Sequence, residues 1–226
     1  MTGIIAPMRR LFPHPADHVT VSEAYGVQRP TTLGRPWVGL CMVSSLDGAT
    51  VVEDNSRALS CDADRDVLLG LREFADMLLV GASTIRIEGY GRPKKPGQRV
   101  AVVSRTGNVN LDCELFTSGA GFLLLPENAP PVACDSVRAG IDRVDFAAAL
   151  ALIDTGFIQA EGGPLLNAAL AEADVLDELN LTISPLICGG DGPRLTTAAA
   201  PMLHQMDLAH VLEEDGFLFT RYVRQH

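Results

Sequence analysis

Two carboxylates, Asp47 and Glu161, carry the chemistry needed to orient a substrate or to stabilise a developing positive charge. Asp47 lies in a polar, turn-rich stretch, and Glu161 ends an apolar run just before Gly-Gly-Pro. A carboxylate at the end of a buried strand needs partners, so an unligated structural role is the less favoured interpretation for Glu161. The Asp47-Gly48 pair can equally be an ordinary turn. Both carboxylates are therefore candidate catalytic residues.

Glycines at two points where a strand precedes a helix predict a site for an anion. Backbone N–H groups from Gly81 through Ser83 to Thr84 open one helix, and those of Gly162–Leu165 open another. Helix N-termini carry partial positive charge, so the two together can bind one pyrophosphate. Pro164 fits the first turn of the second helix, where no N–H is needed. The two segments predict a dinucleotide site, although each alone can be an ordinary helix cap.

Ser104 and Arg105 follow a third strand at the same rim. They are suited to a 2′-phosphate, which would favour NADPH over NADH, although the segment can also be a simple turn. The glycine fingerprint of Rossmann dehydrogenases, the P-loop and the zinc-protease and nucleophile-elbow motifs are absent. The five cysteines are widely spread and no Cys/His cluster occurs, so we expect neither a metal site nor a disulfide framework.

Apolar runs of strand length alternate with helical stretches, which indicates an α/β domain with a mostly parallel central sheet flanked by helices. A C-terminal antiparallel hairpin is predicted around Asp215-Gly216. In such sheets the ligand crevice lies outside the carboxyl ends of the strands, where the candidate segments fall. We expect strands over 37–44, 76–81, 99–104, 121–125, 157–161 and 178–183, and helices over 62–74, 145–154 and from 163 to about 171.

The length of 226 residues favours one domain, 36–226, preceded by an N-terminal arm over 1–35. A net charge of −10 argues against a nucleic acid or an anionic membrane as partner. No apolar run reaches the roughly 20 residues that a membrane span requires, and the first residues do not match a signal peptide. The expected location is therefore the cytoplasm.

Four segments in order, SSLDG, LREFADMLLVGASTIRIEGYG, VVSRTG and EGGPLLNAALAEADVLDELNLTISPLICGGDG, resemble the reductase domain of riboflavin biosynthesis, which has a dihydrofolate-reductase-like fold. The match runs from about Trp37 to Val223. It implies an NADPH-dependent homodimeric enzyme of the 5-amino-6-(5-phosphoribosylamino)uracil reductase type. Such an enzyme passes a hydride to the first carbon of the opened sugar and yields the ribitylamino compound. The deaminase module that often precedes this domain is missing, so only the reduction is expected.

The resemblance also implies roles for individual residues. Glu161 would face the substrate with Asp47 beside it, and Ser56 and Arg72 match substrate contacts. The family's phosphate-binding arginine is displaced, and Arg92 or Lys95 would replace it. The residues expected to contact NADPH are Ser44, Gly81, Ser83, Thr84, Glu88 (in place of an aspartate), Ser104, Arg105, Gly162, Gly163, Pro164, Leu165, Leu166 and Asn167.

Two alternatives stay open at this point. The displaced phosphate contact favours reduction of a pterin or dihydrofolate by the same fold with NADPH. A non-catalytic, NADP-binding scaffold is the less favoured option, because both candidate carboxylates are present.

Overall fold

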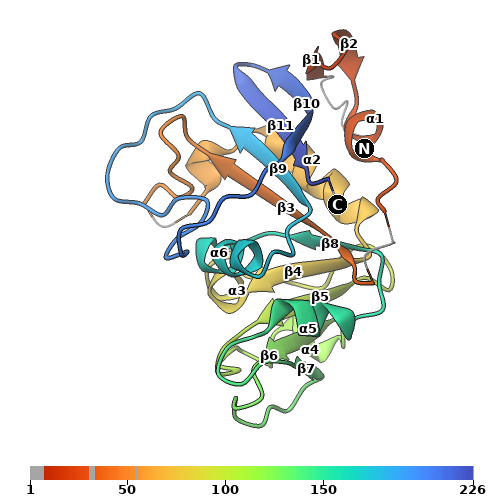
Figure 1. Cartoon of the computed structure of the whole chain (residues 1–226), viewed down its shortest axis with the longest axis vertical. Helices are drawn as coiled ribbons and strands as arrows, with labels where there is room; N and C mark the ends of the chain where they lie inside the picture. Colours follow the sequence, from red (N-terminus) through yellow and green to blue (C-terminus); the bar gives the residue numbers. More distant parts are fainter. Residues whose placement is uncertain (1–7, 31–33, 54, 226) are drawn as a thin grey trace.

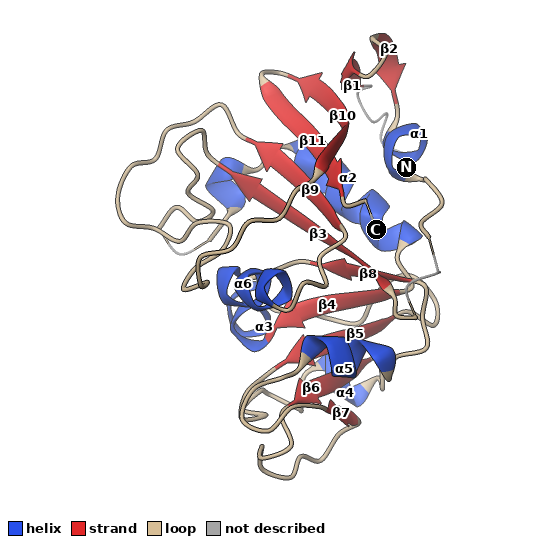
Figure 2. Cartoon of the chain, viewed as in Figure 1, coloured by secondary structure: helices blue, strands red, loops and turns tan. Residues whose placement is uncertain are grey.

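One twisted sheet of eleven strands organises the computed structural model, which describes residues 8–30, 34–53 and 55–225 (Figures 1 and 2). The strand order is β2-β1-β10-β11-β9-β3-β8-β4-β5-β6-β7. The strands are β1 Met8–Phe12, β2 Ala16–Val19, β3 Trp37–Ser44, β4 Met77–Gly81, β5 Arg99–Val103, β6 Gly121–Leu125, β7 Ser136–Arg138, β8 Phe157–Ala160, β9 Glu178–Ile183, β10 Asp207–Glu214 and β11 Phe217–Val223. The helices are α1 Val21–Tyr25, η1 Arg57–Leu59, α2 Asp62–Phe74, α3 Ala82–Glu88, α4 Glu114–Thr117, α5 Phe146–Ala151 and α6 Pro164–Glu172.

The parallel half of the sheet, β9-β3-β8-β4-β5-β6-β7, is covered by helices on both faces. This explains why its central strands are continuous apolar runs rather than alternating ones. On one face Leu79 and Leu124 pack with α5 and α6, and on the other Val80 and Val102 pack with α3 and α4. The α/β architecture predicted from the sequence is confirmed.

The antiparallel half consists of β9, β11, β10, β1 and β2. The hairpin around Asp215-Gly216 is confirmed, with β10 and β11 paired from Asp207↔Val223 to Glu214↔Phe217. The N-terminal segment departs from the expected arm, because residues 8–25 contribute β1, β2 and α1. β1 extends the sheet at the free edge of β10, where Arg9 is paired with Glu213. Strands this short and polar are specified by that distant edge rather than by their own pattern.

The predicted strands and helices agree with the structure to within a few residues. β4 starts at Met77 because the Asp76 carboxylate accepts N–H groups of Gly156 and Phe157. α5 is shorter than expected, starting after Asp145, whose side chain caps it. The short elements β7 and α4 were not predicted. No helix in the described ranges is long and apolar enough to cross a membrane.

Candidate active site

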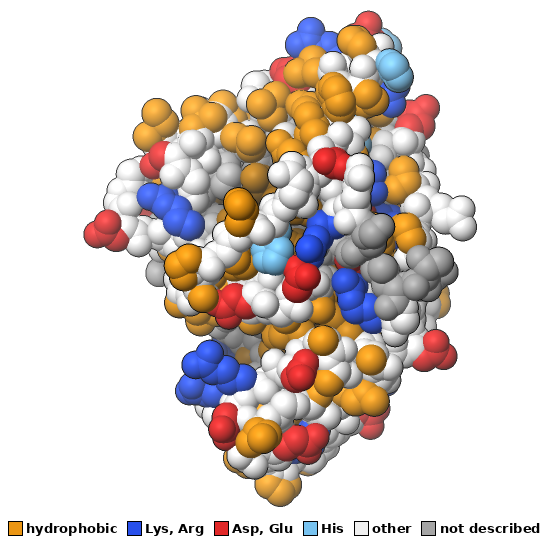
Figure 3. All heavy atoms as spheres, viewed as in Figure 1, with side chains coloured by type: hydrophobic (Ala, Val, Ile, Leu, Met, Phe, Trp, Pro, Cys, Tyr) orange, Lys and Arg blue, Asp and Glu red, His pale blue; other side chains and the backbone are white. Residues whose placement is uncertain are grey.

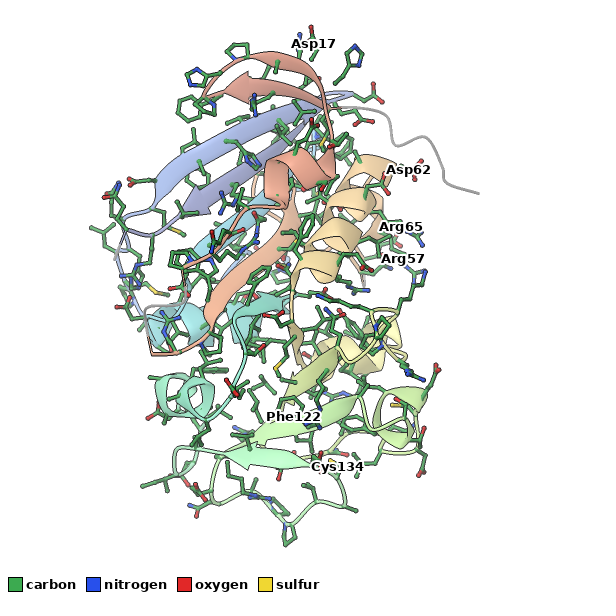
Figure 4. The ribbon with its side chains drawn as sticks, turned by 90° about the vertical axis from the view of Figure 1, so that its right-hand side faces the viewer. Asp17, Arg57, Asp62, Arg65, Phe122 and Cys134 are labelled. Carbon is green, nitrogen blue, oxygen red and sulfur yellow. The ribbon has the colours of Figure 1, made fainter. Side chains whose placement is uncertain are left out.

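A cavity of about 880 Å³ opens at the carboxyl ends of the parallel strands, beside α2. Its walls come from α2, from the loop that follows β3, from the first turns of α3 and α6, and from the segment after α3. This is the crevice that open α/β sheets use for ligands. Figure 4 shows Arg57, Asp62 and Arg65, all of which line the cavity, on the same side of α2.

Helical spacing places one face of α2 on the cavity. Asp64, Leu68 and Arg72 are four residues apart, so their side chains lie above one another along the helix, and all three line the cavity. The adjacent stripe, which includes Val67 and Leu71, is buried in the core. α2 thus presents Arg72 from its last turn to the end of β8.

Glu161 and Arg72 form a bidentate ion pair in this cavity. Arg72 Nε donates to Oε1 of Glu161 and Nη2 donates to Oε2, both at 2.6 Å. The Glu161 side chain is 4% exposed, whereas that of Arg72 is 31% exposed. Burial alone would lower the pKa of Arg72, but the hydrogen bonds and charge of Glu161 outweigh it and raise that pKa. Arg72 therefore stays charged, and the bidentate pair joins two walls of the cavity.

Tyr90 completes this arrangement from the segment after α3. Its hydroxyl donates to Oε2 of Glu161 and accepts from Arg72 Nη2 at 3.3 Å. Burial, and then the negative charge of Glu161, raise the pKa of Tyr90 well above its ordinary value. The hydroxyl consequently remains protonated and remains a donor. Sequence reasoning missed Tyr90, because it lies in an irregular stretch and offers no periodic signal.

The two helix starts predicted to hold a pyrophosphate do come together. The N–H of Gly81 donates to the carbonyl of Gly162 at 2.8 Å, which continues the pairing of β4 with β8 to the start of both helices. A Cβ on Gly163 would lie 3.4 Å from Oγ1 of Thr84. No side chain of the described residues caps either helix. Of these segments, Ser83, Thr84, Gly163 and Pro164 line the cavity.

Asp47 lies apart from the described residues that line the cavity. Its exposed carboxylate accepts a hydrogen bond from the Ser45 hydroxyl at 2.5 Å. It also accepts hydrogen bonds from the N–H groups of Cys188 and Gly189, at 3.1 and 2.7 Å. These hydrogen bonds hold the pKa of Asp47 well below its ordinary value. The geometry shows Asp47 bracing two loops against each other, and a catalytic role for it stays a prediction.

The other predicted NADPH residues occupy varied positions. Leu166 and Asn167 are buried, and their backbone N–H groups donate to the carbonyl of Gly163 at 2.9 and 3.0 Å. Asn167 Nδ2 donates to the carbonyl of Leu195, so these three donors are already engaged within the protein. Ser104 Oγ caps its own turn by accepting from Thr106 and Gly107. Ser44 is buried, whereas Arg105 and Leu165 are exposed. The Glu88 side chain lies outside the described part of the structure. A role for these residues in binding NADPH stays a prediction.

The predicted substrate residues Ser56, Arg72 and Arg92 all line the cavity. Lys95 also lines the cavity, but its Nζ donates to the carbonyls of Glu73 and Ala75 at the end of α2. Its ammonium group is therefore engaged in hydrogen bonds within the protein rather than free to bind a substrate phosphate. Four further cations on the walls have no hydrogen-bond or ion-pair partner for their side chains among the described residues, namely Arg57, Arg65, Arg92 and Lys94. In the same part of the chain, no cluster of His, Cys, Asp and Glu could hold a metal ion.

Known proteins of one family are similar to this chain. A family model described as the RibD C-terminal domain matches residues 36–215. The 2,5-diamino-6-ribosylamino-4(3H)-pyrimidinone 5′-phosphate reductase of Methanothermobacter thermautotrophicus is 26% identical, with 80% of this chain and 95% of that protein aligned. The reductase of the same name from Archaeoglobus fulgidus is also 26% identical, over 70% of this chain and 85% of that protein. The solved structure of a pyrimidine reductase-like protein from Corynebacterium diphtheriae superposes with a TM-score of 0.76 at 20% identity, covering 91% of this chain and 99% of the other. The family resemblance and the fold expected from the sequence are both confirmed.

Proposed function

Because the chain belongs to the RibD C-terminal domain family, we propose that it is an NADPH-dependent reductase that converts a ribosylaminopyrimidine 5′-phosphate into its ribitylamino form. The observation that carries this proposal is the meeting, in one cavity, of the Glu161–Arg72 pair, two glycine-started helices and several unpaired cations. The two archaeal relatives are named as reductases of a diamino compound of this class.

The rim formed by α3 and α6 fits a dinucleotide. Gly162 has φ +81°, and a Cβ there would lie 3.0 Å from Met42 Sδ. The position therefore favours glycine, and no side chain covers the backbone there. The neighbouring helix starts offer N–H groups that no side chain caps, which suits a phosphate. Ser83, Thr84, Gly163 and Pro164 would hold NADPH from the cavity side. When bound, NADPH supplies the hydride.

The unpaired cations suit the phosphate end of the acceptor. Arg57 and Arg65 come from η1 and α2, and Arg92 and Lys94 from the segment after α3, so together they form two sides of the cavity mouth. In a protein of net charge −10, four unpaired cations on the walls of one cavity favour the binding of an anion there, although Asp62, Asp64 and Glu73 line the cavity as well. A pterin head alone, which carries no phosphate, would leave these cations unused.

Glu161 supplies a fixed negative charge at the reacting end. Opening of the ribosylamine ring breaks the bond between the first sugar carbon and the ring oxygen. The ring oxygen takes a proton from solvent, and the nitrogen lone pair forms a C=N⁺ bond to that carbon, which the hydride then reduces to the amine. A carboxylate held in place by Arg72 stabilises that cation without having to reorganise. Asp47 is directed at the loop that it braces, so the geometry favours Glu161 of the two predicted catalytic carboxylates.

The test is NADPH oxidation by the purified protein with three acceptors: the 2,5-diaminopyrimidinone ribosyl phosphate, the aminouracil ribosyl phosphate and dihydrofolate. We expect turnover of one or both pyrimidines and none of dihydrofolate.

The double variant R57Q/R65Q should raise KM for the phosphorylated acceptor about tenfold or more, with a much smaller effect on KM for the dephosphorylated form. Turnover of dihydrofolate alone would support the pterin alternative, and no oxidation with any acceptor would overturn the proposal.

We also propose that the chain forms a homodimer through the open face of its antiparallel strands. On β9 the alternation is inverted, because Glu178, Asn180 and Thr182 are buried while Leu179, Leu181 and Ile183 are half-exposed. The paired residues of β11 on the same face are Tyr222, Thr220 and Leu218. Figure 3 shows hydrophobic side chains gathered over these strands. An apolar sheet face of this kind is typical of a protein interface. Leu181→Lys should give a monomer in sedimentation analysis, and an unchanged mass would contradict the proposal.

A further inference from the structure

Tyr90 is the second partner of Glu161 after Arg72, and the three residues come from three separate elements. Arg72 lies in the last turn of α2, Glu161 follows β8, and Tyr90 lies two residues beyond α3. The Tyr90 hydroxyl contacts both members of the ion pair, and the Arg72 guanidinium lies 5.4 Å from the centre of its ring. All three side chains line the cavity.

The segment that carries Tyr90 is anchored on α2. Lys95 Nζ donates to the carbonyls of Glu73 and Ala75 at 2.8 and 2.7 Å. Gln98 Nε2 donates to the carbonyls of Arg72 and Ala75 at 2.7 and 2.8 Å. These four bonds satisfy carbonyls at the end of α2, which otherwise lack partners. They also anchor Lys95 and Gln98, at the end of the segment that carries Tyr90, against the helix that presents Arg72.

This arrangement leaves Tyr90 few alternative roles. A phenol whose pKa is raised is a poor acid, which argues against direct proton donation to the substrate. The raised pKa does, however, keep the hydroxyl protonated, and so Tyr90 remains a hydrogen-bond donor to Glu161. Arg72 donates twice to Glu161, but it is partly exposed and its side chain is long. A third donor from a second wall of the cavity removes the freedom of the carboxylate to rotate.

We propose that Tyr90 is a positioning residue for the reduction, whose hydroxyl fixes the Glu161 carboxylate against the reacting carbon of the sugar. This inference rests on the proposed function. It assigns to Tyr90 a role that neither the sequence motifs nor the names of the relatives indicate. The consequence is that loss of one hydroxyl should slow hydride transfer without weakening the binding of NADPH.

The test uses Tyr90→Phe, which removes only the hydroxyl and keeps the ring beside Arg72. We expect kcat to fall about tenfold or more, KM for NADPH to stay within about twofold, and the isotope effect with deuterated NADPH to rise as hydride transfer becomes slower. The matched control is Thr117→Val in α4, which removes an exposed hydroxyl outside the cavity and should behave as the wild type. Thermal unfolding of both variants shows whether the fold is retained, a separate question from the kinetics.

A double-mutant cycle with Glu161→Gln identifies the path of the effect. If Tyr90 acts through Glu161, Tyr90→Phe will change kcat by less than about twofold once Glu161 is replaced. Fully additive losses, or a Tyr90→Phe variant with wild-type kcat, would overturn the positioning role alone. A wild-type protein that binds but never oxidises NADPH would overturn the proposed function and this inference with it.

Calorimetric binding of the phosphorylated acceptor without NADPH should be unchanged in Tyr90→Phe. A loss of affinity of about tenfold would assign the hydroxyl to binding and contradict the proposal.

Discussion

Two buried carboxylates on neighbouring parts of the sheet, Glu178 and Glu161, have opposite surroundings. Glu178 starts β9, is fully buried and accepts five hydrogen bonds from Arg29, Trp37, Asn180 and Arg221, at 2.8 to 3.1 Å. Glu161 follows β8 and has two partners in a cavity open to solvent. The first carboxylate is closed off by protein on every side, while the second has room for a ligand.

The different surroundings of Glu178 and Glu161 indicate different roles for the two carboxylates. Burial opposes ionisation of Glu178, but the hydrogen bonds of Arg221 and the charge of Arg29 outweigh it and lower its pKa to about 2. Arg29 belongs to the N-terminal segment and Arg221 to β11, so this ion cluster ties distant parts of the chain together. Glu161 connects only residues of the cavity walls. We therefore expect replacement of Glu178 to lower the free energy of unfolding and replacement of Glu161 to lower kcat.

The largest expected effect on stability is that of Glu178→Gln. Removing the charge leaves two buried guanidinium groups without their counterion, which typically costs about 3–5 kcal/mol. Denaturant unfolding measures the loss in the free energy of unfolding. The control is Asp135→Asn, which breaks an exposed pair with Arg99 and should cost about 1 kcal/mol or less. Equal losses in the two variants would contradict the assignment of Glu178 to the fold.

His210 should make the same region sensitive to acid. Burial, and then the charge of Arg221, lower the pKa of His210 to about 4 from 6.5. Between these values the unfolded chain binds the proton and the folded protein does not, so stability falls as the pH drops from about 6.5 to 4. The loss is on the order of 3 kcal/mol. His210→Phe keeps the edge contact with Tyr25 and should remove most of this slope in unfolding measured across that range. The control is His14→Phe at an exposed position, and this variant should keep the dependence of stability on pH.

Gly162→Ala tests the cavity rim with a smaller expected effect. The added Cβ would require a left-handed backbone at φ +81° and would lie 3.0 Å from Met42 Sδ. We expect a loss of about 1–2 kcal/mol in the free energy of unfolding and weaker binding of NADPH in a calorimetric titration. Gly192→Ala is the matched control, since its Cβ would meet Val51 O at an ordinary 3.5 Å. NADPH affinity unchanged in Gly162→Ala would argue against this rim as the dinucleotide site.

Asp47→Asn should have the smallest effect on turnover. If Asp47 braces the loops around Cys188 and Gly189, its replacement will speed amide exchange in 186–190 and leave kcat within about threefold of the wild type. Hydrogen exchange and steady-state kinetics measure the two effects. A fall in kcat comparable to that of Glu161→Gln would instead restore the catalytic interpretation of Asp47.

The sequence predicted the parts of the molecule that local pattern determines. The apolar runs of β3, β4 and β6 require burial on both faces, and the glycines before α3 and α6 mark their starts. Glu161 could be singled out because a carboxylate at the end of such a run is conspicuous.

The remaining features depend on partners that are distant in sequence. β1 is a strand because β10 offers it an edge about 200 residues later, as in the pairing of Arg9 with Glu213. The burial of Glu178 at the start of β9 depends on Arg29 and Arg221, which pair with its carboxylate. Tyr90 lies in a loop whose course is set by Lys95 and Gln98 at the end of α2. No local pattern contains this information.

The most direct test of the account is kcat and the free energy of unfolding of Glu161→Gln, measured on the same preparation with NADPH and the ribosylaminopyrimidine phosphate. We expect kcat to fall about 100-fold or more, because a preorganised charge at the reacting carbon is lost. The free energy of unfolding should change little, because the freed Arg72 can reach the solvent of the cavity. Wild-type kcat in a variant that is strongly destabilised would contradict the account, since Glu161 would then be a structural residue like Glu178.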